Sequence, residues 1–262
     1  MWYESYAVWL AIASAGFVLL ERLFPARREQ KLVRGQLPND FLYLLLNGHF
    51  FGLWTATIAA LLAERSHGVL ESLSLAPERG WLADRPFWLQ FTLFLVLSDF
   101  AQWCIHNLLH RVPFLWNFHK VHHSIHTMDW IGNFRFHWME IVVYRSLQYL
   151  PLLYLGGDPA PLLTVYVFAT FWGHFNHANL NWSIGPLGYV FNSPRMHLWH
   201  HDASDEGGTA KNFGIVLSLW DWLFGTAYWP RDRAPEKIGY PEDAEMPRNW
   251  LLQLGFPFTR SR

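Results

Sequence analysis

The sequence predicts an all-α protein, a polytopic membrane bundle of about three to five membrane helices joined to a water-facing helical part. Two observations predict this class. The 262-residue chain is 52% hydrophobic and 18% aromatic but only 16% charged, and it holds more Trp and Phe than a soluble core requires. Several stretches without charged residues are also long enough to cross a hydrocarbon core of about 30 Å.

Three membrane spans are expected in the first half of the chain. The first covers roughly residues 3–24 and lacks the basic run of a signal peptide, so we expect it to be retained. The second covers residues 41–63, which contain no Asp, Glu, Lys or Arg. The third covers residues 86–110 and is interrupted only by Asp99.

A helical hairpin is expected from residues 139–156 and 159–178, with its turn at the Gly and Pro residues between them. Each arm has only about 18 to 22 residues, so the hairpin either spans the membrane or enters it in part. The chain from about residue 182 onward is expected to face water and to end in a charged, proline-rich tail at about residues 227–262.

The loops predict an orientation. The loop after the first span is rich in Arg and Lys, whereas residues 64–85 balance their arginines with acidic residues. Because basic residues of short loops stay in the cytoplasm, the third span and the hairpin should both end on the cytoplasmic side. We therefore expect an integral membrane protein, in a bacterial inner membrane or an ER-type membrane, whose histidine clusters all reach the cytoplasmic face.

Histidine is the unusual residue: the chain has 14, and ten of them fall into four short clusters. An HxxxH pair puts two imidazoles on one helix face, and each of the two HxxHH strings, HKVHH and HLWHH, does the same for three. We expect the ten to bind metal: His106, His110, His119, His122, His123, His174, His177, His197, His200 and His201.

The number of histidines favours two metal ions over one. A zinc site uses three or four protein ligands, fewer than the clusters supply. Imidazole suits Zn, Cu, Fe and Ni about equally, so the ligand type alone does not name the metal. A membrane-embedded site with open coordination suits a redox metal that activates O2 against a C–H bond, whereas zinc has no redox chemistry. A redox metal such as iron is therefore expected at both sites, although purified protein can carry zinc.

Three further residues are candidates for orienting the metal-binding histidines. Asp99 lies seven residues before His106, and we expect its carboxylate to accept a hydrogen bond from an imidazole. His137 is expected beside the metal site, and Asp202, which follows His201, is a similar candidate.

Several strings resemble the fatty acid hydroxylase and sterol desaturase superfamily. They are SDFAQWCIHNLLHRVPFLWNFHKVHHS (98–124), NFRFHWME (133–140), HANL (177–180), NSPRMHLWHHD (192–202) and KNFGIVLSLWDWLFGT (211–226). The resemblance covers about half of the chain, with the motifs in the right order. The chain departs from the family pattern at Trp138, where proline is expected, and at His174, whose position varies.

The resemblance implies a helical membrane protein with a histidine-rich dimetal site in a cytosolic cap, which uses O2 and external electrons to hydroxylate or desaturate a lipid. The ligands carried over by position are nine of the ten histidines, all except His174. We expect residues 1–262 to form one oxidoreductase domain with its catalytic region at about 86–226. We expect no fused cytochrome domain within these residues, and the expected electron donor is a separate ferredoxin or cytochrome with its reductase.

Other functions are weighed against this one. With a net charge of −1, the chain offers no basic surface for nucleic acid. A zinc-dependent membrane hydrolase, a bis-histidine haem carrier and a non-catalytic metal-binding member of the family stay open as alternatives. The sequence does not name the lipid or the oligomeric state.

Overall fold

The computed structural model describes residues 6–50, 82, 84–154, 159–204, 211–241 and 243–258. These residues are mostly helical, and within the same ranges β structure is limited to isolated bridges. The helices are α1 (Tyr6–Leu23), α2 (Leu37–Tyr43), which continues as a π-helix (Leu44–Phe50), α4 (Phe87–Arg111), α5 (Pro113–His123), α6 (Trp138–Tyr154), α7 (Pro159–His177), α8 (Pro194–His200), α9 (Leu219–Phe224) and α10 (Trp250–Gly255). Short 3-10 helices lie at Trp130–Phe134, Gly185–Tyr189 and Asp243–Glu245.

A proline creates the first corner of the site. Val112 has an extended backbone (φ −96°, ψ 112°), because a residue before proline disfavours the helical conformation. Pro113 then begins α5, a position that needs no backbone N–H. The chain therefore turns sharply, and α5 packs back against α4.

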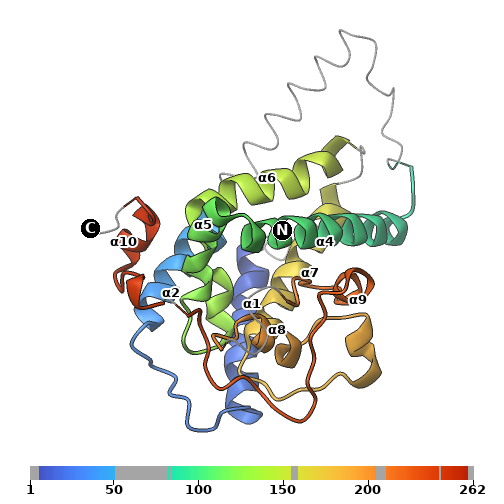
Figure 1. The fold of residues 1–262 in the computed structure, drawn as a ribbon. Helices are drawn as coiled ribbons and strands as arrows, with labels where there is room; N and C mark the ends of the chain where they lie inside the picture. The colour runs from blue at the N-terminus through green and yellow to red at the C-terminus, as the bar shows by residue number, and fades with distance from the viewer. Residues whose placement is uncertain are drawn as a thin grey trace.

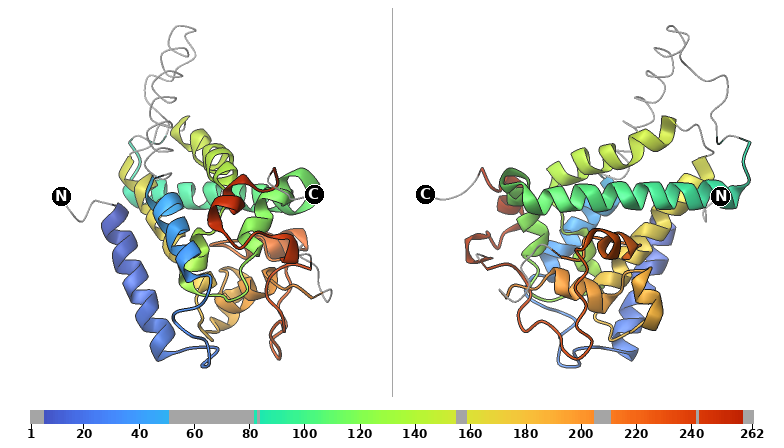
Figure 2. Two further views of the ribbon diagram at one scale, coloured as in Figure 1. Left: turned by 90° about the vertical axis from the view of Figure 1, so that its left-hand side faces the viewer. Right: turned by 45° about the vertical axis from the view of Figure 1, so that its right-hand side comes forward.

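The long helix α4 is the centre of the packing. It contacts α5, α6 and α7, while α7 also contacts α1 and α8. Figures 1 and 2 show α6 on one side of α4, and α8 and α9 on the other. This arrangement brings the C-terminal ends of α4, α5, α7 and α8 together, and these ends carry the histidine clusters.

The structure confirms the helical class. Helices α1, α4, α6 and α7 cover four of the expected spans, whereas residues 51–63 of the second span and the hairpin turn at 155–158 lie outside the described residues. Among the helices described, α4 alone is both long and apolar enough to cross a membrane. The membrane bundle and its orientation therefore stay predictions.

Candidate metal centre

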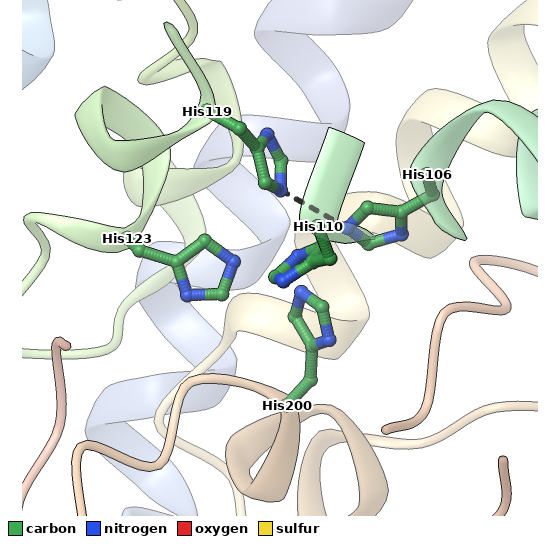
Figure 3. A group of neighbouring side chains, drawn as sticks. All are labelled: His106, His110, His119, His123 and His200. Atoms are coloured by element: carbon green, nitrogen blue, oxygen red, sulfur yellow. Dashed lines mark hydrogen bonds between the residues drawn. The ribbon is translucent and has the colours of Figure 1, made fainter. Parts of the chain in front are cut away.

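Nine histidines form two groups in the interior. The first group contains His106, His110, His119, His123 and His200, and Figure 3 shows its rings turned toward a common centre. The second group contains His122, His177, His197 and His201. Within each group, the ligand nitrogens all lie within 4.8 Å of one another. Eight of the nine residues are buried, and His110 is partly buried.

Neighbouring residues belong to different groups. On α5, His123 belongs to the first group and His122 to the second, and His200 and His201 divide in the same way at the C-terminal end of α8. A helix turns about 100° per residue, so adjacent side chains point in different directions. The two groups remain close, since the rings of His123 and His201 are 4.5 Å apart. Each HxxHH string therefore serves both groups.

Five histidines have their outer nitrogen, Nδ1, bonded to an oxygen. The acceptors are the carbonyls of Phe213 for His106 (2.8 Å), Arg135 for His122 (3.0 Å), Gly173 for His177 (2.9 Å) and Lys211 for His200 (2.7 Å), and the Glu140 carboxylate for His119 (2.6 Å). Carbonyl and carboxylate oxygens only accept, so each Nδ1 carries a hydrogen, and in the neutral ring Nε2 keeps its lone pair. This is the tautomer in which Nε2 binds metal, and the outer bond orients the ring.

The inner nitrogens face one another. His106 Nε2 lies 3.1 Å from His119 Nε2, and His122 Nε2 lies 3.3 Å from His177 Nε2. Because both members of each pair direct a lone pair inward, the approach is repulsive unless a cation lies between them. A metal ion would supply that cation.

Further buried nitrogens have no partner among the described residues. Both ring nitrogens of His110, His123 and His201 are in this position, as are His197 Nδ1 and His200 Nε2. A buried polar atom left unpaired costs about 1–3 kcal/mol. The residues present therefore fit metal ions at both groups, with nitrogen donors alone.

Burial favours the neutral form of five of these histidines, two on α5 and three at α8. It lowers the pKa of His200 to about 3, and together with charge repulsion from neighbouring rings it lowers the pKa of His122, His123, His197 and His201 well below the usual value. Neutral imidazole is the form that binds a metal ion.

A loop after α8, residues 211–218, supplies two of the acceptor carbonyls to the first group. The Asp221 carboxylate holds this loop, since it accepts hydrogen bonds from the backbone N–H groups of Phe213 (2.8 Å) and Gly214 (2.9 Å). A side chain at Gly214 would collide with the carbonyl oxygen of Leu217. Asn212 has a left-handed backbone (φ 54°), and its side chain bonds to Met196 and Tyr228. The KNFG sequence thus builds a rigid support for His106 and His200.

Asp99 does not orient an imidazole as expected. Its carboxylate accepts hydrogen bonds from the backbone N–H groups of Val216 (2.9 Å) and Leu217 (3.0 Å) and from the indole of Trp220 (3.0 Å). The seven-residue spacing places Asp99 on the same face of α4 as His106, but about 10 Å from it along the helix axis. Asp99 therefore fastens the supporting loop to α4.

The other two orienting candidates also lie outside the groups. His137 accepts from the backbone N–H of Met139 at the start of α6, and its Nε2 bonds to the Leu254 carbonyl (2.7 Å). Asp202 pairs with Lys211 (3.3 Å), whose carbonyl accepts from His200. Asp202 is thus linked to the first group through Lys211.

His174 belongs to neither group. It lies on α7 one turn before His177, and its ring packs against Phe17, Trp130 and Phe134. Its Nδ1 is 3.4 Å from the Asn133 amide. His174 is therefore surrounded by aromatic rings, away from the two centres.

Glu140 is the functional candidate that the sequence reasoning missed. It is buried on α6, and it is the one carboxylate that bonds to a histidine of either group among the described residues. The available signal was an acidic residue within the apolar hairpin arm, where a carboxylate is costly unless it has a role.

A cavity beside both groups is bounded by α4, α6 and α7. It reaches His106 and His119 of the first group and His122 and His177 of the second. Its remaining wall is mostly apolar, with Leu109, Phe136, Ile141, Ala169 and Ile215 among the lining residues. A molecule in this cavity would contact rings of both groups.

The fold and the site define a helical protein with a histidine-rich centre suited to two metal ions. The family model for fatty acid hydroxylases matches residues 91–226. The chain is also 32% identical to the ornithine lipid hydroxylase OlsE of Rhizobium tropici, over 92% of this chain and 72% of that protein. The chain therefore belongs to the fatty acid hydroxylase family, which confirms the resemblance in the sequence.

More distant relatives share the central part of the chain. The alkylglycerol monooxygenase of Caenorhabditis elegans is 29% identical over 60% of this chain and 30% of that protein. A Delta(7)-sterol 5(6)-desaturase of Aspergillus fumigatus is 26% identical over 62% of this chain and 46% of that protein. The chain thus spans less than half the length of these two relatives. No solved structure matched the chain.

Proposed function

We propose that this protein is a membrane-embedded di-iron oxidoreductase that hydroxylates or desaturates a C–H bond of a lipid. The family and the named relatives, which are a lipid hydroxylase, a monooxygenase and a sterol desaturase, support oxidation of a lipid. The observation that carries the proposal is the pair of all-histidine groups that share one cavity.

Each group would hold one iron ion through imidazole nitrogens. The first group offers five residues and the second offers four, so each ion can keep a position for O2. Once bound, the two ions would supply the reduction of O2 and the removal of hydrogen from the lipid. Hydroxylation would convert R–H, O2, two electrons and two protons into R–OH and water. Desaturation would use the same inputs to convert CH2–CH2 into CH=CH with release of two waters.

The residues of the chain would orient the ligands and exclude bulk water. Outer hydrogen bonds hold His106, His119 and His200 with Nε2 directed inward. Apolar walls would receive a lipid chain and place one C–H bond next to both groups. The two electrons would come from a separate ferredoxin or cytochrome with its reductase.

We further propose that the chain is one integral membrane domain with the metal centre on the cytoplasmic side. Helix α4 supports this, since it is long and apolar enough to cross a membrane and ends at His110 and Arg111. The positively charged loop after α1 supports the orientation. Accessibility labelling of single cysteines in sealed vesicles would test it.

The reaction is tested by lipid mass spectrometry on cells that express the chain or the double variant His200→Ala/His201→Ala. We expect a lipid with one added oxygen, or with two hydrogens fewer, only with the intact chain. Purified protein should contain about two iron atoms per chain, one for each group. One zinc per chain without O2 uptake would contradict the proposal and favour a hydrolase.

A further inference from the structure

Hydrogen-bonding side chains line the facing sides of α4 and α6. On α4, Ser98, Gln102 and His106 follow one another at intervals of four residues, and on α6, Glu140, Tyr144 and Gln148 do the same. Such spacing puts each set on one helix face. Polar residues of this kind in an apolar helix pair are costly unless they are paired or functional.

The orientation of the buried Gln148 amide is determined by its neighbours. Its nitrogen donates to the Ser98 carbonyl (3.3 Å) and to Gln102 Oε1 (3.1 Å). The opposite orientation would place Gln148 Oε1 against the Ser98 carbonyl oxygen, which repels it. Gln148 therefore donates an N–H to Gln102, and Gln102 accepts this hydrogen bond through its side-chain oxygen.

The Gln102 amide nitrogen is consequently directed away from Gln148. Gln102 lies one turn before His106 and lines the cavity that reaches both histidine groups. The donors of Asn133 and Thr170, which line the same cavity, bond to His174 and to the Tyr166 carbonyl. No bond from the Gln102 nitrogen to another described residue is present.

We propose that the Gln102 amide donates a hydrogen bond to an oxygen of the substrate, and that Gln148 holds it in position. This inference rests on the proposed function and names the substrate class: a lipid with an ester, ether, amide or hydroxyl oxygen near the C–H bond that reacts. A pure hydrocarbon chain has no acceptor for this donor. The hydrogen bond would fix how far the chain enters, and so which carbon meets the metal centre.

The test compares the full-length protein with Gln102→Met, which keeps the side-chain length and removes the amide. Radiolabelled methyl palmitate is bound to each purified protein in nanodiscs. Unlabelled methyl palmitate or heptadecane is then added as the competitor. We expect the intact protein to prefer the ester over the hydrocarbon by about five- to tenfold, the contribution of one net hydrogen bond, and Gln102→Met to lose the preference. Hexadecyl glycerol ether, as a third competitor, separates a carbonyl acceptor from an ether or hydroxyl acceptor.

Gln90→Met is the matched control. Gln90 is buried on the same helix, donates to the Arg85 carbonyl (2.7 Å) and is not among the residues that line the cavity. We expect Gln90→Met to keep the ester preference. Gln148→Leu should reduce the preference by about half as much as Gln102→Met, since the Gln102 amide, no longer held by Gln148, still donates. If Gln102→Met fails to fold, Gln148→Leu decides the result.

Failure of this inference differs from failure of the proposed function. Equal affinity for ester and hydrocarbon in the intact protein, or an unchanged preference in Gln102→Met, overturns the substrate assignment even if lipid oxidation is observed. If Gln102→Met loses the ester preference but the intact protein yields no oxidised product, the binding site is upheld and the oxidoreductase proposal is contradicted.

Discussion

The two histidine groups differ in what holds their outer nitrogens. In the first group, His119 bonds to the carboxylate of Glu140, and His106 and His200 bond to a loop that Asp221 holds in place. In the second group, His122 and His177 bond only to backbone carbonyls, those of Arg135 and Gly173. Side-chain substitutions can therefore weaken the first group alone, whereas the second depends on the backbone path.

That backbone path is stabilised by buried charge. Arg135 is fully buried, and its guanidinium donates to Asp40 on α2 (2.6 Å) and to the carbonyl of Ser124, directly after α5 (3.1 Å). Arg34 also pairs with Asp40 and with Asp129. The N-terminal segment thus supports the second group through ion pairs.

The largest expected effect comes from the adjacent pair His200 and His201. Replacing either one with Ala should reduce activity by at least about 1,000-fold, because both ions take part in the reaction. Each variant should lose roughly half of the bound metal, His200→Ala from the first group and His201→Ala from the second. Metal analysis together with Mössbauer spectra checks this. Identical spectra for the two variants would contradict the division into two groups.

The next largest effect is expected at the ion pairs that support the second group. Arg135→Met should lower the free energy of unfolding by about 3–5 kcal/mol, since it leaves a buried Asp40 charge with fewer partners. Denaturant unfolding measures the loss. A double variant, Arg135→Met with Asp40→Leu, should recover part of it, and an absence of recovery would mean that the pair is not the cause.

Glu140→Gln should act on the first group only. The neutral amide orients His119 less strongly than the carboxylate does, and we expect metal affinity at the first group to fall roughly 10- to 100-fold. Metal titration followed by spectroscopy should show the second group filling normally. Asp202→Asn is the comparison, because Asp202 bonds to Ser204 and Lys211 rather than to a ring, and we expect a smaller loss than with Glu140→Gln. Equal loss from both groups would contradict the distinction.

The smallest effect is expected at His174. His174→Phe should leave the metal content unchanged and alter the free energy of unfolding by less than about 1.5 kcal/mol, since phenylalanine fits among the surrounding aromatic rings. Metal analysis and thermal unfolding check both values. A loss of one metal ion would show that His174 is a ligand after all.

The wrong expectation for Asp99 and the omission of Glu140 have the same cause. Asp99 shares a helix face with His106, and periodicity suggested that they interact. Instead, the Asp99 carboxylate accepts hydrogen bonds from the backbone of Val216 and Leu217 in the supporting loop. Glu140 orients His119 across 21 residues, and no helical period relates them. In both cases the partner comes from another segment of the chain, and local patterns carry no information about such contacts.

The sequence by itself determined the helices and the shared faces of the histidine clusters. Pro113 ends α4 and begins α5, and the HxxxH and HxxHH spacings put the imidazoles on one side of each helix end. Only the tertiary structure decided which histidines meet. His122 and His123 are adjacent in the chain, yet they face different centres because α7 approaches one and α4 the other. Spacing determines the direction of a side chain, whereas the packing of the helices determines what it faces.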